Sequence, residues 1–284
     1  MTPDTGARSD ILRQVGVISA VSFMIVAAMV GSGLFGGTDV SELQDGALSA
    51  EATVLAPDSP AFSIWSVIYV LMIAYTVWQA LPSQRARTRQ RRAGWWVALT
   101  AVLNGFWLLA AQFLTLFATV AAIVLLLVAL ALTIRVLTVH PRESVVDAVL
   151  LDVTVGLHLG WVTLATVANT TAWLAADVVP ASWGEAAEPI GIAVLVVVAL
   201  IGIAVGVGTR GRLAPPLAMA WGLLWIGIGR TAGEPASTPV AIAAWIAAAL
   251  IVVTPVIVLA TGRGRGELAS GRSAGHRTAH PVAR

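Results

Sequence analysis

The 284-residue chain contains no cysteine and no lysine, and only 11% of its residues are charged. Without cysteine it can form neither disulfides nor thiolate metal sites, and its four histidines are too dispersed for a recognisable zinc site. No G-x-x-x-x-G-K-[ST] or G-x-G-x-x-G motif occurs, which argues against a nucleotide-hydrolysing module, a Rossmann unit or a kinase. We therefore expect no metal and no resident cofactor.

Hydrolytic motifs are also missing: there is no H-E-x-x-H, no evident pair of carboxylates and no Ser–His–Asp arrangement. We expect the protein not to be an enzyme, and any catalysis would have to come from photochemistry of a bound ligand. The sequence pI is about 9.9. The basic residues flank apolar segments instead of forming a nucleic-acid-binding patch, so we expect no nucleic-acid partner.

Hydrophobic residues make up 58% of the chain, and the mean hydropathy is +0.86. Apolar stretches long enough to cross about 30 Å of hydrocarbon occur eight times. They lie near 14–35, 61–81, 94–113, 117–138, 146–168, 188–208, 213–230 and 238–261. The fold class predicted is an all-α integral membrane protein with eight transmembrane helices. Reading the first stretch as a signal peptide is less favoured, because the run is long and no convincing cleavage site follows it.

The distribution of charge predicts an orientation. Eight spans place both ends of the chain on one side, and all arginines except Arg230 fall on that side. The other side carries Asp39, Glu42, Asp45, Glu51, Asp58, Asp177, Glu185, Glu188 and Glu234. The positive-inside rule assigns the arginine-rich side to the cytoplasm. We expect a multi-pass protein of the cell (inner) membrane, in contact with membrane lipids and with both termini cytoplasmic.

Three polar segments lie outside the spans. Residues 1–13 form a short cytoplasmic N-terminus, and 262–284 form a basic tail, rich in Gly, Ser, Ala and Arg, that we expect to be disordered. Residues 36–59 form an acidic external loop. Loops of this length in a compact bundle are often lids or binding loops.

An aromatic run follows this loop. Pro60 and a capping Asp58 or Ser59 are typical of a helix start, and Phe62, Trp65 and Tyr69 then recur at three- and four-residue steps on one helix face. Packing between helices or against lipid is the simpler alternative to a binding surface.

Asn104 and Trp107 share a face of the third span. The amide of Asn104 lies within the hydrocarbon and must find polar partners, so it is either a hydrogen-bonding contact between helices or a binding group.

The fifth span combines glycines with polar and aromatic residues. Gly156 and Gly160 have the G-x-x-x-G spacing that permits close helix approach, and His158, Trp161 and Ala165 lie on the same helix. His158 near the bilayer midplane is either a functional ionisable group or a neutral, hydrogen-bonded side chain.

Two carboxylates, Asp147 and Asp152, enter this fifth span from the cytoplasmic side. We expect Arg135, at the end of the preceding span, to form a structural ion pair with Asp152, with a proton relay as the alternative.

Together these runs resemble the tryptophan-rich sensory protein family, TspO/MBR, which includes the mitochondrial translocator protein. The resemblance covers about 12–175 and depends on three runs in order: Pro60, Phe62, Trp65 and Tyr69; Leu103, Asn104 and Trp107; and 159–163 (Leu-Gly-Trp-Val-Thr) with Ala165, Thr166 and Asn169. It implies that 14–175 form a five-helix bundle whose loop closes over an apolar pocket. The helices of 188–261 are then additional.

The resemblance implies a membrane receptor or sensor for a flat, apolar, porphyrin- or sterol-like ligand. The expected ligand-binding residues are Phe62, Trp65, Tyr69, Asn104, Trp107, His158, Trp161 and Ala165. A small-molecule transporter, proton-coupled through Asp152 and His158, is the alternative function. The expected partners are the apolar ligand and membrane lipids, with a homodimer left open.

Overall fold

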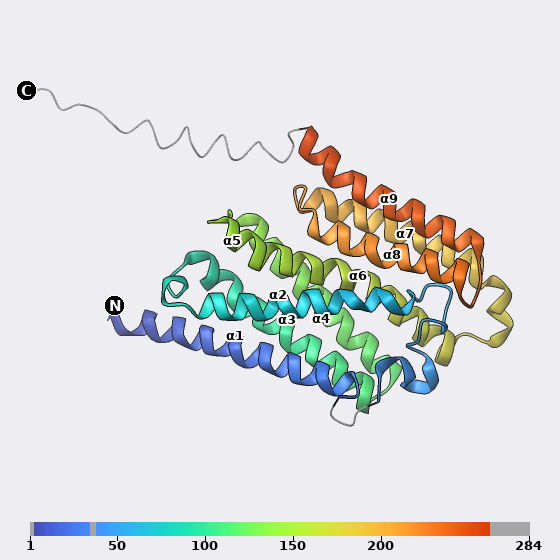
Figure 1. The fold of residues 1–284 in the computed structure, drawn as a ribbon, viewed down its shortest axis with the longest axis horizontal. Coiled ribbons are helices and arrows are strands. Elements are labelled where there is room, and N and C mark those ends of the chain that lie inside the picture. Colours follow the sequence, from blue (N-terminus) through green and yellow to red (C-terminus); the bar gives the residue numbers. More distant parts are fainter. Residues whose placement is uncertain (1–2, 35–37, 262–284) are drawn as a thin grey trace, which may run out of the picture.

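The computed structural model describes residues 3–34 and 38–261, and these residues form helices and turns without any strand. The long helices are α1 (Pro3–Gly31), α2 (Ile64–Ala80), α3 (Thr88–Phe113), α4 (Leu116–Val139), α6 (Thr154–Trp173), α7 (Ala187–Gly208), α8 (Ala214–Ala232) and α9 (Thr238–Ala260). Short α5 (Val145–Asp147) and a π-helical turn, Ala148–Val153, lead directly into α6. The prediction of an all-α membrane protein with eight long helices is confirmed (Figure 1).

Within the described residues, seven helices are long and apolar enough to cross a membrane. Helix α8 is the less apolar one, because it contains Pro215, Pro216 and Arg230. The predicted spans mark only the apolar parts of the helices. Helix α1 therefore begins at Pro3 and the fifth span runs over 145–178, because polar residues continue both helices past the apolar segment.

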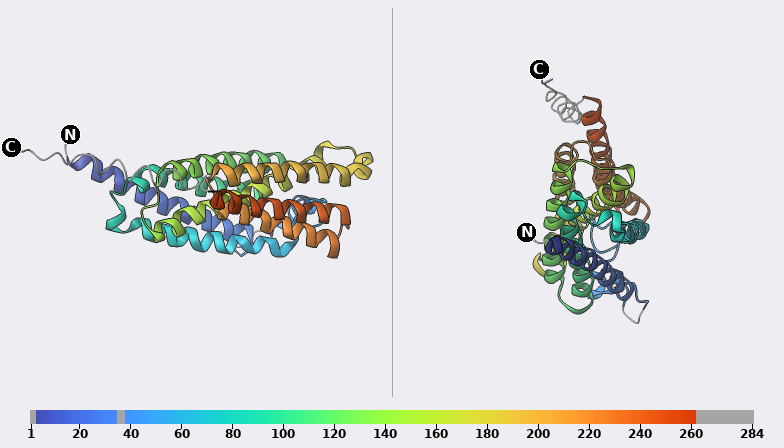
Figure 2. Two further views of the ribbon diagram at one scale, coloured as in Figure 1. Left: turned by 90° about the horizontal axis from the view of Figure 1, so that it is seen from above. Right: turned by 90° about the vertical axis from the view of Figure 1, so that its left-hand side faces the viewer.

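The helices run side by side along the long axis of the molecule (Figure 2). Helix α1 packs on α3, α3 on α4, α4 on α6, α6 on α8, and α9 on both α8 and α7. One buried core lies among α1 to α6 and includes Trp161; a second lies among α6 to α9 and includes Leu164. Helix α6 therefore faces both cores and joins the first five helices to the last three.

The contact between α6 and α8 depends on glycine. A Cβ atom on Gly160 would lie 2.1 Å from the backbone oxygen of Pro215, and one on Gly156 would lie 2.8 Å from the Cβ of Ala214. The G-x-x-x-G spacing thus permits the close helix approach that the sequence predicts.

The expected Arg135–Asp152 pair is wrong. Arg89 Nη2 donates to both carboxylate oxygens of Asp152, at 2.8 and 2.9 Å, and Arg212 Nε donates to Oδ1 at 3.0 Å. Arg142 Nε lies 3.3 Å from the other oxygen. Arg89, from the first turn of α3, also pairs with Asp147 and is 2% exposed, whereas Arg135 lies on an exposed face of α4. Arg89 therefore reaches the carboxylates from inside the bundle.

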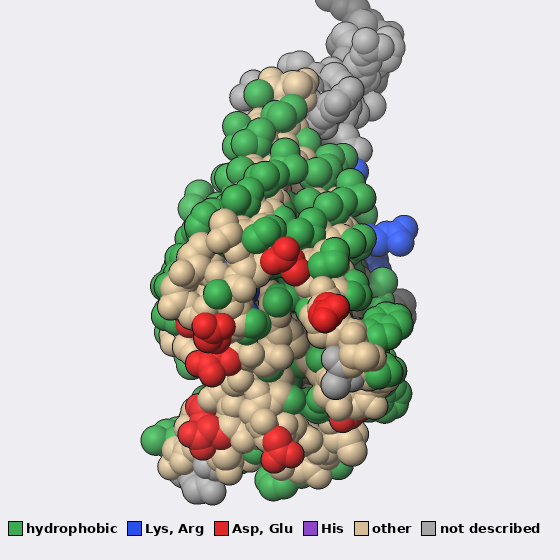
Figure 3. All heavy atoms as spheres, turned by 90° about the vertical axis from the view of Figure 1, so that its right-hand side faces the viewer, with side chains coloured by type: hydrophobic (Ala, Val, Ile, Leu, Met, Phe, Trp, Pro, Cys, Tyr) green, Lys and Arg blue, Asp and Glu red, His purple; other side chains and the backbone are tan. Residues whose placement is uncertain are grey.

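Charge is separated between the two ends of the bundle. Helix α1 begins and α9 ends at one end, which also carries the Arg89 cluster (Figure 1). Acidic side chains are spread over the opposite end, around the 38–58 segment of the loop (Figure 3). Residues 36–37 and the tail 262–284, whose disorder the sequence predicts, lie outside the described residues.

We expect Gly160→Ala to lower the free energy of unfolding by about 1–3 kcal/mol, because the added methyl group would overlap the Pro215 backbone. The measurement is thermal or denaturant unfolding in detergent. Gly208→Ala is the matched control, since a Cβ there meets no atom within 4 Å. Equal stability of the two variants would contradict the close contact between α6 and α8.

We expect Arg89→Gln to destabilise the protein by about 3–5 kcal/mol, because it leaves the carboxylates of Asp147 and Asp152 buried with less compensating charge. Arg135→Gln removes an exposed arginine and should change stability by less than about 0.5 kcal/mol. Unfolding in a non-ionic detergent compares them. A larger loss of stability for Arg135→Gln than for Arg89→Gln would instead support the Arg135–Asp152 pair expected from the sequence.

Candidate ligand-binding pocket

The 38–58 segment lies over the acidic end of the first five helices and leads into α2. The Asp58 carboxylate accepts a 2.7 Å hydrogen bond from the Ser59 N–H and caps the 3₁₀ turn Ser59–Ser63, which has Pro60 near its start. This cap matches the helix start predicted from the sequence. The cap thereby fixes the orientation of the turn, which carries Phe62, and of the start of α2, which carries Trp65.

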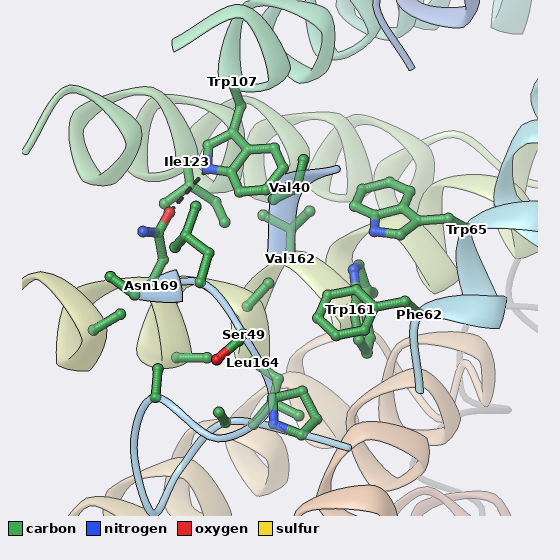
Figure 4. Close-up of a pocket in the computed structure, with 18 of the residues that line it drawn as sticks. Val40, Ser49, Phe62, Trp65, Trp107, Ile123, Trp161, Val162, Leu164 and Asn169 are labelled. Atoms are coloured by element: carbon green, nitrogen blue, oxygen red, sulfur yellow. Dashed lines mark hydrogen bonds between the residues drawn. The ribbon is translucent and has the colours of Figure 1, made fainter. Parts of the chain in front are cut away.

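A cavity with a volume of about 70 Å³ lies beneath this segment. Its walls come from the loop and from α2, α3, α4 and α6 (Figure 4). Of the residues predicted to bind ligand, those that line it are Phe62, Trp65, Asn104, Trp107, Trp161 and Ala165. These residues come from the Ser59–Ser63 turn and from α2, α3 and α6, and they span more than one hundred positions of the sequence.

Aromatic rings form one side of the cavity. The ring of Trp161 meets Phe62 edge-on at 5.6 Å between centroids and meets Trp65 edge-on at 6.2 Å. Trp65 in turn stacks on Tyr69 at 5.3 Å. Edge-to-face and stacked pairs each add about 0.5–1.5 kcal/mol beyond buried area, so this aromatic wall is preorganised.

Hydrogen bonds orient the opposite wall. The Trp107 indole N–H donates to the Asn169 side-chain oxygen at 2.8 Å (Figure 4). The Asn169 amide in turn donates to the Thr119 hydroxyl at 2.8 Å. Asn169 was missing from the residues predicted to bind ligand, although it follows Ala165 by one helical turn. This four-residue spacing places Asn169 on the same helix face as Ala165 and could have identified it from the sequence.

Two residues that line the cavity each have a buried polar atom without a partner in the described part of the chain. The side-chain oxygen of Asn104 and the indole nitrogen of Trp161 are buried, each residue being 1% exposed, and neither atom makes a hydrogen bond. The interpretation of Asn104 as a hydrogen-bonding contact between helices therefore finds no support. Buried polar atoms without partners cost about 1–3 kcal/mol each, and a ligand that pairs with them would recover part of that cost.

His158, although predicted to bind ligand, does not line the cavity. Its fully buried ring packs behind Trp65, with 5.7 Å between the ring centroids, and its Nε2 has no hydrogen-bond partner among the described residues. Trp65 therefore stands between His158 and the cavity.

Tyr69 lines a second cavity, of about 360 Å³, between α1, α2, α3 and the loop. This cavity shares Phe62, Trp65 and Trp107 with the first one. The two cavities are neighbours, separated mainly by these aromatic side chains.

The second cavity exists because α1 and α2 are joined tightly at only one end. At the basic end, Gln14 donates to the Gln79 carbonyl oxygen at 2.8 Å, and Gln79 donates back to the Gln14 carbonyl oxygen at 3.2 Å. At the acidic end, Ala28 and Gly31 of α1 face Tyr69 of α2 across the cavity. The two helices therefore diverge toward the loop.

The last three helices hold the loop in place. Arg230 of α8 is 2% exposed and donates to the backbone oxygens of Ala50 and Thr53 at 2.9 and 3.0 Å. Arg230, the one arginine that the sequence places on the acidic side, is thus buried against the loop. Leu55 of the loop packs in the core that α6, α7, α8 and α9 share.

The fold and this pocket define a polytopic helical membrane protein with a loop-covered, tryptophan-lined cavity. A family model described as TSPO-like protein matches residues 13–257, so the chain belongs to this family. The match includes α7, α8 and most of α9, which the sequence resemblance had placed outside the family. Searches of curated proteins and of solved structures give no match.

We expect Arg230→Gln to loosen the loop, because hydrogen bonds from a charged donor contribute about 1.5–3 kcal/mol. The chain has no cysteine, so Ser49→Cys provides a single thiol on the loop for maleimide labelling. Labelling should become about 10- to 100-fold faster in the Arg230→Gln background. Arg87→Gln, at the basic end, is the control, and equal rates in all three proteins would show that Arg230 does not hold the loop.

Proposed function

We propose that the protein is a membrane receptor or sensor that binds a flat, apolar ligand of the porphyrin or sterol type beneath the 38–58 segment. The observation that carries the proposal is the pair of buried, unpartnered polar atoms on Asn104 and Trp161, two residues that line a mostly apolar cavity. Binding pockets typically combine apolar walls with a few convergent polar groups of this kind.

The size of the cavity beneath the loop limits how a ligand can bind. About 70 Å³ is far below the roughly 300–1,000 Å³ of ordinary small-molecule pockets. We infer that a ring-shaped ligand displaces the loop or the shared side chains of Trp65 and Trp107 and extends into the second cavity. The divergence of α1 and α2 at the acidic end gives a route from the membrane into that space.

The transporter alternative finds less support. Asp152 is held by Arg89, Arg212 and Arg142 at the basic end, and His158 is buried behind Trp65. These two groups are not linked by the hydrogen bonds of the described residues. We propose binding without catalysis, in a cell membrane, with the arginine-rich end in the cytoplasm as the positive-inside rule indicates.

The variant Asn104→Leu tests whether Asn104 contributes to ligand binding or to the stability of the fold. The Asn104 oxygen has no partner in the protein, so its removal should leave the free energy of unfolding unchanged or raise it. If a bound protoporphyrin uses this amide, its Kd should rise about tenfold, as expected for the loss of one buried hydrogen bond. The Kd is followed by the absorbance of the porphyrin itself, so that substitutions of tryptophan do not alter the reporter.

Trp161→Phe and Trp95→Phe form the matched pair for the same titration. Trp161 lines the cavity, whereas Trp95 lies at the basic end of α3 and is 51% exposed. Porphyrin and a sterol are both tested, because either fits the proposed ligand class. Unchanged affinity for both ligands in Asn104→Leu and Trp161→Phe would show that these residues only pack the bundle, and the proposed function would be lost.

A further inference from the structure

A third cavity, of about 630 Å³, lies on the outer side of α6, between α4 and α7. It forms because α4 packs on α3 and α6 while α7 packs mainly on α9, so the two helices leave the face of α6 between them uncovered. None of its lining residues belongs to the pocket beneath the loop. This groove, defined by Leu127, Ile134, Leu159, Val167, Ile201 and Val205, is a separate feature of the surface.

The groove has an apolar floor and apolar walls. Thr163 and Thr166 are the polar residues of the floor, but their hydroxyls donate to the carbonyl oxygens of Leu159 and Val162, each at 2.7 Å. Their donors are therefore already satisfied within the helix. From Arg135 to Leu127 the α4 wall extends about 12 Å along the helix axis, at 1.5 Å per residue. This depth and polarity suit an acyl chain.

The mouth of the groove is basic. Arg135 stands on the last turns of α4, and Arg210 lies in the turn after α7, where its positive φ of 58° directs the chain into α8. Within the described residues, Arg135 makes no hydrogen bond or ion pair, although it is the arginine that the sequence assigned to Asp152. Asp147 and Asp152, at the same end, are already paired with Arg89. Other acidic side chains are spread over the opposite end of the molecule (Figure 3).

We propose that this groove binds one anionic phospholipid, with the phosphate at Arg135 and Arg210 and an acyl chain along α6. Charge complementarity selects this occupant, because two guanidinium groups at the end of an apolar groove match an anionic headgroup joined to a hydrocarbon chain. Basic pockets between transmembrane helices bind such headgroups in other membrane proteins. The lipid would cover the face of α6 where the five-helix bundle meets the last three helices. This proposal does not depend on the proposed receptor function.

The test is native mass spectrometry of the full chain, released from detergent after incubation with equimolar phosphatidylglycerol and phosphatidylcholine that carry the same acyl chains. The wild type should retain phosphatidylglycerol preferentially. Arg135→Gln should reduce this preference about fivefold, and Arg135→Gln with Arg210→Gln should reduce it further. Arg92→Gln, an exposed arginine at the same end that lines none of the cavities described, should leave the preference unchanged.

A second variant tests the groove itself. Gly208 lines the groove, and a Cβ there meets no atom within 4 Å, so Gly208→Leu adds a side chain at the groove and keeps both arginines. It should reduce retention of phosphatidylglycerol while thermal unfolding stays the same. Equal retention of both lipids by the wild type, an equal loss in Arg92→Gln, or unchanged retention in Gly208→Leu would each overturn the proposal.

Discussion

The packing of α6 against α8 at backbone distance is the constraint on which the rest of the structure depends. It joins the two cores, and it also positions the aromatic wall of the cavity, because glycine occurs on both sides of the contact. A Cβ on Gly222 of α8 would lie 2.2 Å from Leu164 and 3.3 Å from Trp161. Without side-chain atoms at that position, Trp161 can turn toward Phe62 and Trp65 and form part of the cavity wall. The small size of Gly222 thus determines where the ring of Trp161 lies.

The two ends of the bundle use polar groups differently. At the basic end, charged and amide side chains pair with one another and leave helices α1, α2, α3 and α6 firmly connected. At the acidic end, polar groups of the cavity are left without partners, and α1 separates from α2. Unsatisfied polar groups and loose packing are what a binding end requires, because a ligand can then supply contacts that the protein lacks. The Arg89 ion-pair cluster and the loop-covered cavities are therefore located at opposite ends of the bundle.

Much of the fold could be predicted from hydropathy alone, since long apolar runs in a membrane allow little besides helices. Periodicity also indicated the correct faces for Phe62, Trp65, Asn104, Trp107 and Trp161. Periodicity could not predict which side chains on those faces reach the cavity. Tyr69 and His158 lie on the expected helices, but Tyr69 lines the neighbouring cavity and His158 packs behind Trp65.

The partner of Asp152 could not be predicted because the choice among arginines depends on tertiary packing. Arg135 is closer in the sequence, yet Arg89 enters from α3 and is the one enclosed by neighbouring helices. Arg230 shows the opposite case. Its position on the acidic side was visible in the sequence as an exception, and that exception was a usable sign of a specific role in holding the loop.

The contact that Arg230 makes has a consequence for how the loop can vary. Its guanidinium binds main-chain oxygens, at Ala50 and Thr53, and no side chain of the loop takes part in these two bonds. Substitutions on the loop that keep its backbone path would therefore leave the attachment intact. The side chains that face the cavity, such as Leu48 and Ser49, could change to suit different ligands while the same arginine kept the loop in position.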